Sequence, residues 1–143
     1  MHEALQSKQK GAGIKLYHGT VKARLANIKK HGLLPAKVTH IRNFSGFANA
    51  KYVYVTKYQR DAWTYALMTG AITANKYPHL NNEPIVLRFE VKSFLLEKDP
   101  IGEGRNDYRL AKRIEPEYIQ KIITKQDVSE KFLMTLIVTL GVG

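Results

Sequence analysis

The segment 85–91 constrains the fold of this 143-residue chain more than any other. Its odd-numbered residues are all large and apolar, whereas its even-numbered residues include an arginine and a glutamate. This alternation is typical of a β-strand that has one face in a hydrophobic core and the other partly solvated. The chain is therefore expected to contain a sheet with a covering layer.

Other segments predict the remaining elements. β-Branched and aromatic runs indicate strands, and apolar residues at helical spacing indicate two helices. Thr56 and Gln59 stand at capping-box spacing before the second helix, and Gly32 is a C-cap candidate for the first. The irregular basic stretch 36–51 is expected to be a long loop over a site. The expected strands are 14–17, 52–56, 85–91, 108–111, 119–124 and 132–139, and the expected helices are 21–31 and one that opens near Gln59.

This order of elements favours an α+β fold with two packed, mainly antiparallel sheets and few helices. Residues 14–143 are expected to form one domain, and the polar residues 1–13 a flexible leader. The sequence contains no cysteine, which excludes disulfides and cysteine-based metal sites. It also shows neither a signal peptide nor an apolar run of about 18 residues, so a cytoplasmic protein is expected.

Positive charge is concentrated in the first half of the chain. Residues 1–60 hold twelve Lys or Arg residues and one acidic residue, whereas residues 61–143 hold eleven of each. Such asymmetry is typical of a surface that meets polyanions, although solubility alone could also explain it.

Three residues are the main candidates for function. His18 follows an apolar run and precedes Gly19, so its imidazole is expected at a strand end, where it could hydrogen-bond a ligand hydroxyl. Gly19 would let a ligand amide approach the backbone. Tyr54 and Tyr65, on a strand and the following helix, could face each other across a gap the size of a ring. Taken singly, the histidine could be a turn residue and the tyrosines ordinary core aromatics.

The combination of Tyr17-His18-Gly19-Thr20 with Tyr54 and Tyr65 resembles the diphtheria-toxin-like ADP-ribosyltransferases, a group that includes the poly(ADP-ribose) polymerases. The resemblance covers about residues 16–119. It implies two packed sheets with a few helices around an NAD cleft, NAD as a substrate, no metal, and transfer of ADP-ribose to a macromolecule with release of nicotinamide. His18 would then anchor the ribose, Tyr54 and Tyr65 would stack the nicotinamide, and Gly19 and Thr20 would border it, with Lys15 as a further helper.

The resembled family usually also carries an acid on a later strand. Asp107 is the preferred candidate because it opens a short expected strand, whereas Glu103 lies between two glycines. Such a carboxylate would stabilise the positive charge that develops on the ribose. Asp107 could instead cap a turn, and a chain without a working acid would be a binder or would use other chemistry.

The acceptor and two other functions stay open. Lys37, His40 and Arg42 could contact an acceptor, which could be tRNA or DNA or else an acidic protein, and a toxin-like role fits such a compact chain. The RNA 2′-phosphotransferases begin similarly, bind NAD and clamp a phosphate with histidine and arginines, but normally carry an additional N-terminal domain. A non-enzymatic nucleic-acid binder is the third possibility. A Rossmann enzyme is not expected, because no glycine-rich dinucleotide loop follows a strand.

Overall fold

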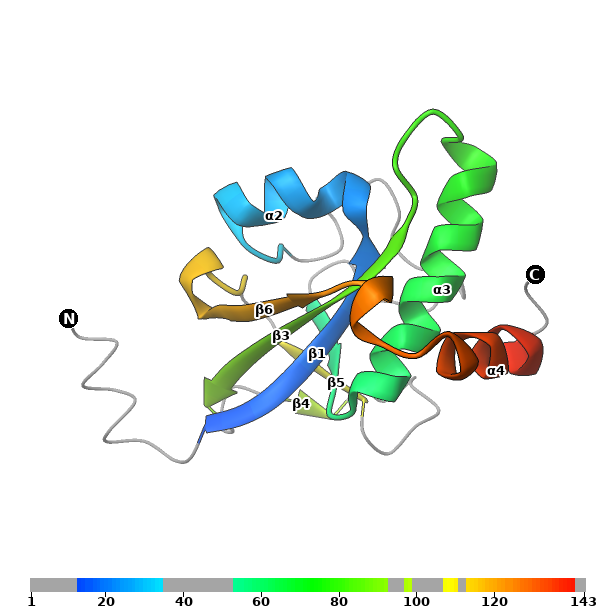
Figure 1. Ribbon diagram of the computed structural model, residues 1–143. Helices are drawn as coiled ribbons and strands as arrows, with labels where there is room; N and C mark the ends of the chain where they lie inside the picture. Colours follow the sequence, from blue (N-terminus) through cyan, green and yellow to red (C-terminus); the bar gives the residue numbers. More distant parts are fainter. Residues whose placement is uncertain (1–12, 35–52, 93–96, 99–106, 111–112, 141–143) are drawn as a thin grey trace.

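We describe residues 13–34, 53–92, 97–98, 107–110 and 113–140 of a computed structural model. This part of the chain is α+β, with helices on both faces of an antiparallel sheet (Figure 1). The strands are β1 (Gly13–Val21), β2 (Val53–Thr56), β3 (Pro84–Lys92), β4 (Glu97–Lys98), β5 (Asp107–Leu110) and β6 (Ile119–Ile123). The α-helices are α2 (Leu25–His31), α3 (Gln59–Lys76) and α4 (Glu130–Leu140), and the 3₁₀ helices are η1 (Lys22–Arg24), η4 (Pro116–Tyr118) and η5 (Lys125–Asp127).

The described strands form one sheet in the order β4-β5-β2-β1-β3-β6. β1 pairs with β3 along its whole length, from Gly13 opposite Lys92 to Val21 opposite Pro84. By contrast, the described residues of β1 and β2 share one register pair, Tyr17 opposite Thr56. The sheet therefore has two well-paired halves, β4-β5-β2 and β1-β3-β6, which meet at a narrow β1–β2 junction.

Each face of the sheet has its own hydrophobic cluster. The even-numbered residues of β1 lie on the face that α2 and η4 cover, where Leu16 packs with Ile28 of α2. The odd-numbered residues lie on the opposite face, where Tyr17 packs against a cluster built around Trp63 of α3 and Leu133 of α4. Figure 1 shows α2 on one side of the sheet and α3 and α4 on the other.

α3 lies directly on β1, and glycine makes this approach possible. A Cβ atom on Gly19 would overlap the Ala62 carbonyl oxygen and would lie 2.7 Å from the Ala66 amide nitrogen. Further along α3, a Cβ on Gly70 would lie 3.2 Å from a ring carbon of Pro84, at the start of β3. α3 therefore runs along β1 toward the end of β1 that pairs with Pro84.

The α+β class was predicted correctly, but two packed sheets were not observed in the described part of the chain, which forms a single sheet. The strand that carries His18 was predicted to end near Tyr17, and this was wrong. β1 continues through Val21 because β3 pairs with it there. The first helix begins correspondingly later, at Leu25 after the 3₁₀ turn η1, and its C-cap is Gly32, as predicted, with a positive φ of +82° that favours glycine.

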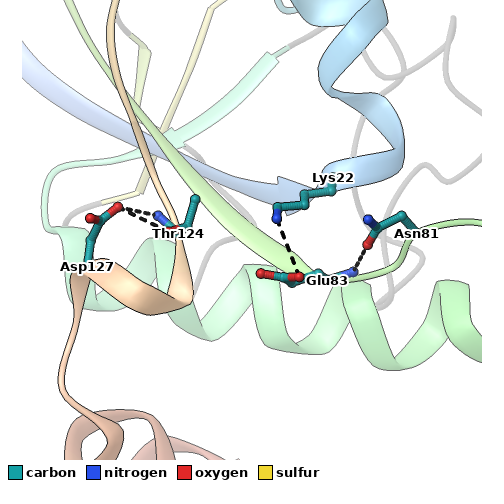
Figure 2. Close-up of polar contacts among 5 residues, drawn as sticks. All are labelled: Lys22, Asn81, Glu83, Thr124 and Asp127. Atoms are coloured by element: carbon teal, nitrogen blue, oxygen red, sulfur yellow. Dashed lines mark hydrogen bonds and ion pairs between the residues drawn. The ribbon is translucent and has the colours of Figure 1, made fainter.

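The start of α3 also differs in detail from the prediction. Its N-cap residue is Tyr58, and no side chain caps it, so Thr56 and Gln59 form no capping box. The capping box instead lies at η5, where the Asp127 carboxylate accepts a hydrogen bond from the Thr124 backbone N–H at 2.8 Å (Figure 2). Thr56 is instead the last residue of β2, and its side chain is buried.

Residues 132–139 were predicted to form a strand, and this was wrong because they lie in α4. β-Branched residues suggested the strand, but Leu133 and Leu136 recur at helical spacing and are buried with Trp63. The threonines are also accommodated within the helix, since Thr135 Oγ1 donates to the Lys131 carbonyl at 2.9 Å. Packing therefore outweighed local strand propensity. None of the helices in the described ranges is long and apolar enough to cross a membrane.

Candidate functional site

The imidazole of His18 lies at the β1–β2 junction. Its Nδ1 atom donates a hydrogen bond to the backbone carbonyl of Tyr54 at 2.8 Å. Because a carbonyl oxygen can only accept, Nδ1 carries the proton in the neutral ring and Nε2 keeps its lone pair. The prediction that His18 lies at the end of its strand was therefore wrong. His18 lies at the point where pairing of β1 with β2 stops and pairing of β1 with β3 continues.

The environment keeps this ring neutral near pH 7. Burial lowers the pKa of His18 below its ordinary value of 6.5, while the hydrogen bond to Tyr54 partly opposes this shift. The positive charge of Arg24 lowers the pKa further. A neutral imidazole with a fixed Nδ1–H group can accept a hydrogen bond at Nε2 from a hydroxyl group of a ligand.

Arg24 is placed near His18 by the turn that follows β1. This turn, η1, is attached to the segment before β3: the Lys22 N–H donates to the Glu83 carbonyl at 2.9 Å, and the Ala23 N–H to that of Asn81 at 2.8 Å. Lys22 Nζ also lies 3.5 Å from Glu83 Oε1, and Figure 2 shows the two side chains pointing toward each other. The sequence analysis missed Arg24, since only the path of η1 brings it close to the histidine.

Tyr54 and Tyr65 lie on the same face of the sheet and at the same level along β1. Tyr17 is opposite Thr56, so Tyr54, two positions back along β2, is level with Gly19. Gly19 in turn faces Ala66 of α3, the residue that follows Tyr65. Trp63, in the cluster shared with β3 and α4, lies on the opposite flank of α3, so helical periodicity turns Tyr65 toward β2.

His18, Gly19, Tyr54 and Tyr65 therefore lie at about the same level of the β1–β2 junction, but on its two faces. The His18 ring approaches the β1–β2 junction from the α2 side, and the two tyrosines lie on the α3 side. Both tyrosines are half-buried. The structure also requires glycine at position 19, because the backbone of α3 occupies the space beside its Cα atom. The sequence did not reveal this requirement.

Of the two acid candidates, the structure describes the position of Asp107 but not that of Glu103. The backbone of Asp107 lies opposite Thr56 in the β2–β5 pairing, two positions along β2 from Tyr54. Directly opposite Tyr54 itself is Arg109, a half-buried cation that the sequence analysis missed because the register of β5 could not be read from the sequence. Glu103 lies outside the described residues.

The other predicted site residues fall into two groups. Thr20 is buried, with 2% of its surface exposed, and Lys15 is exposed near the start of β1. The predicted acceptor contacts Lys37, His40 and Arg42 lie in the segment 35–52, outside the described residues.

Comparison with known proteins adds no functional information to this geometry. No protein-family model and no curated protein sequence matches the chain.

Proposed function

We propose that the protein is an NAD-dependent ADP-ribosyltransferase that transfers ADP-ribose to a macromolecule and releases nicotinamide. The observation that carries this proposal is the fixed, neutral His18 ring at the level of Tyr54 and Tyr65. At this level, His18 Nε2 can accept a hydrogen bond from a hydroxyl group, and the rings of Tyr54 and Tyr65 lie beside the point where pairing of β1 with β2 stops. The resemblance to diphtheria-toxin-like transferases implies that these three residues bind NAD, and their common level in the sheet supports this proposal.

In this proposal, each residue has one task. His18 Nε2 accepts a hydrogen bond from a ribose hydroxyl and so orients the sugar. Tyr54 and Tyr65 hold the nicotinamide ring by stacking. Exclusion of water by these rings would strengthen any electrostatic contact to the reacting ribose.

The reaction breaks the bond between the ribose C1′ atom and the nicotinamide nitrogen. The electron pair of this bond leaves with nicotinamide, whose ring charge is thereby neutralised, while positive charge develops on the ribose. The nucleophile of the acceptor then bonds to C1′ and loses its proton to a carboxylate or to water. Asp107 is our candidate for the carboxylate, and Glu103 is the alternative.

Release of nicotinamide from NAD, with and without cell lysate as an acceptor source, tests the proposal. Substitution His18→Ala should lower the rate by about 100-fold, because the ribose loses its positioning contact. Substitution His79→Ala, at an exposed histidine beyond α3, is the matched control and should have no effect. Retention of activity within about threefold in His18→Ala, a barrier change under about 0.7 kcal/mol, would remove the main support for the assignment.

The same assay tests whether Tyr65 acts through its ring or through its hydroxyl. Stacking needs the ring and not the hydroxyl, so Tyr65→Phe should remain active while Tyr65→Ala should not. Equal losses in both variants would indicate a role for the hydroxyl instead.

The two acid candidates are distinguished by Asp107→Asn and Glu103→Gln. Both variants are measured for reaction rate and for NAD affinity, and substitution of the true acid should lower mainly the rate.

Two arginines favour a second candidate, transfer of an RNA 2′-phosphate to NAD. Arg24 lies near His18, and Arg109 lies opposite Tyr54 in the β2–β5 pairing, so two arginines border the candidate site. Guanidinium groups bind phosphate through paired hydrogen bonds. A 2′-phosphorylated RNA oligonucleotide incubated with NAD should lose its phosphate only if this second activity is the correct one.

A further inference from the structure

The short connection between β2 and α3 carries an exposed aromatic ring between two cations. Tyr58 is 53% exposed, and it is the only aromatic among the large hydrophobic side chains that are exposed in the described ranges. Lys57 and Arg60 are exposed on either side of it. Neither cation forms an ion pair with any residue that the structure describes. The ring is thus available to a partner and is flanked by positive charge.

The backbone holds this tyrosine in a defined place. Tyr58 is the N-cap residue of α3, and its carbonyl oxygen accepts hydrogen bonds from the N–H groups of Asp61 at 3.1 Å and Ala62 at 3.3 Å. Ala62 is itself packed against Gly19 of β1. The ring therefore projects from a fixed backbone, which reduces the conformational entropy lost when a ligand stacks on it.

This position borders the candidate NAD site. Tyr58 follows Tyr54 of β2 by four residues and precedes Tyr65 of α3 by seven, which is about two helical turns. Tyr58 is the N-cap residue of α3, so it lies at the end of the helix that joins β2. At a rise of about 1.5 Å per residue, it lies roughly 10 Å along the helix from Tyr65.

The charge distribution indicates what this surface binds. Both charged residues of the segment 53–60, Lys57 and Arg60, are cations, and the first acid of α3 is Asp61. An aromatic platform between cations is the arrangement with which proteins bind single-stranded nucleic acid, because bases stack on the ring while cations contact the phosphates. An acidic protein would use the cations but would gain little from the ring.

We propose that the surface formed by Lys57, Tyr58 and Arg60 binds a single-stranded nucleic acid, with one base stacked on Tyr58. This inference rests on the proposed function, and it identifies the acceptor of ADP-ribose as a single-stranded nucleic acid. The reacting nucleotide would lie at the NAD site while a neighbouring base stacks on Tyr58. At about 3.4 Å per stacked nucleotide, a separation of roughly 10 Å corresponds to about three nucleotides.

Binding of fluorescein-labelled 12-nucleotide DNA and RNA strands, measured by anisotropy without NAD, tests this surface. Substitution Tyr58→Ala should weaken binding about tenfold, whereas Tyr58→Phe should remain within about twofold of the unmodified protein. Leu80→Ala, at another exposed apolar residue, is the matched control and should change nothing. The double substitution Lys57→Ala with Arg60→Ala should reduce the slope of log affinity against log salt by about 1.4.

Absence of oligonucleotide binding at low salt, or equal binding by the protein and Tyr58→Ala, would overturn the inference. Equally tight binding of a polyglutamate peptide that is insensitive to Tyr58→Ala would also overturn it and would point to an acidic protein. The assay contains no NAD, so it is independent of catalysis. A protein that binds oligonucleotides through Tyr58 but never releases nicotinamide would refute the proposed function and leave the surface standing.

Discussion

His18 shows how one residue can have its protonation set by its position in a sheet. Its Nδ1–H group is used by the Tyr54 carbonyl, and burial disfavours a second proton on the ring. The sequence indicated this residue as a candidate site residue, which stays a prediction, but it placed the residue wrongly at a strand end. The hydrogen bond could not be predicted, because it depends on where the pairing between β1 and β2 stops.

The lowered pKa of His18 predicts a pH dependence of stability. The unfolded chain binds a proton at this histidine near its ordinary pKa of 6.5, whereas the folded protein does so only at lower pH. The free energy of unfolding should therefore fall as the pH decreases below 6.5, until the folded pKa is passed. Thermal unfolding between pH 7.5 and 5 should show this loss, and His18→Gln should reduce it.

The exposed histidine His31 provides the control for this experiment. Substitution His31→Gln should leave the pH dependence of the melting temperature unchanged. If His18→Gln and the unmodified protein lost stability in parallel over this range, the neutral state of His18 would not be a property of the fold.

At the scale of elements, the contact between α3 and β1 organises the site. α3 brings Tyr65 to the level of Tyr54 because its backbone lies directly on Gly19. The helix itself and most of the strands were predictable from hydrophobic periodicity. The closeness of the contact was not, since a glycine in the sequence does not reveal which backbone approaches it.

Substitution Gly19→Ala should therefore destabilise the protein by about 1–3 kcal/mol, because the added methyl group meets the backbone of α3 rather than a movable side chain. The matched control is Gly13→Ala in the same strand, where the added methyl group would meet only the flexible end of Glu90. This control should change stability by less than about 0.5 kcal/mol. Chemical denaturation measures both, and equal effects would show that α3 can move away at little cost.

At the scale of the whole molecule, the unequal pairing of β1 with its neighbours divides the sheet. β1 is paired with β3 over its full length but has one described register pair with β2. Sequence patterns identified most strands, but their order was not predictable, because it depends on long-range pairing. The proposed site lies at this division, where residues from β1, β2 and α3 that are far apart in the sequence lie at one level.

Hydrogen exchange should reveal the division. Amides of β1 and β3 should exchange slowly, since their opening requires disruption of the long ladder and of the core on both faces. Amides of β2 should exchange faster, because its half of the sheet can open separately. Mass spectrometry of peptides that cover 53–56 and 84–92 measures this difference, and equal protection of both peptides would contradict it.

The route of the chain sets a limit on such opening. Among the described strands, the backbone passes between the two halves four times, from β1 to β2, β2 to β3, β3 to β4 and β5 to β6. Neither half is a continuous piece of sequence, so no single cut could yield one half as an independent fragment. The covalent connections therefore join the two halves at the junction where the described strands share one register pair, so local opening there would not separate the halves.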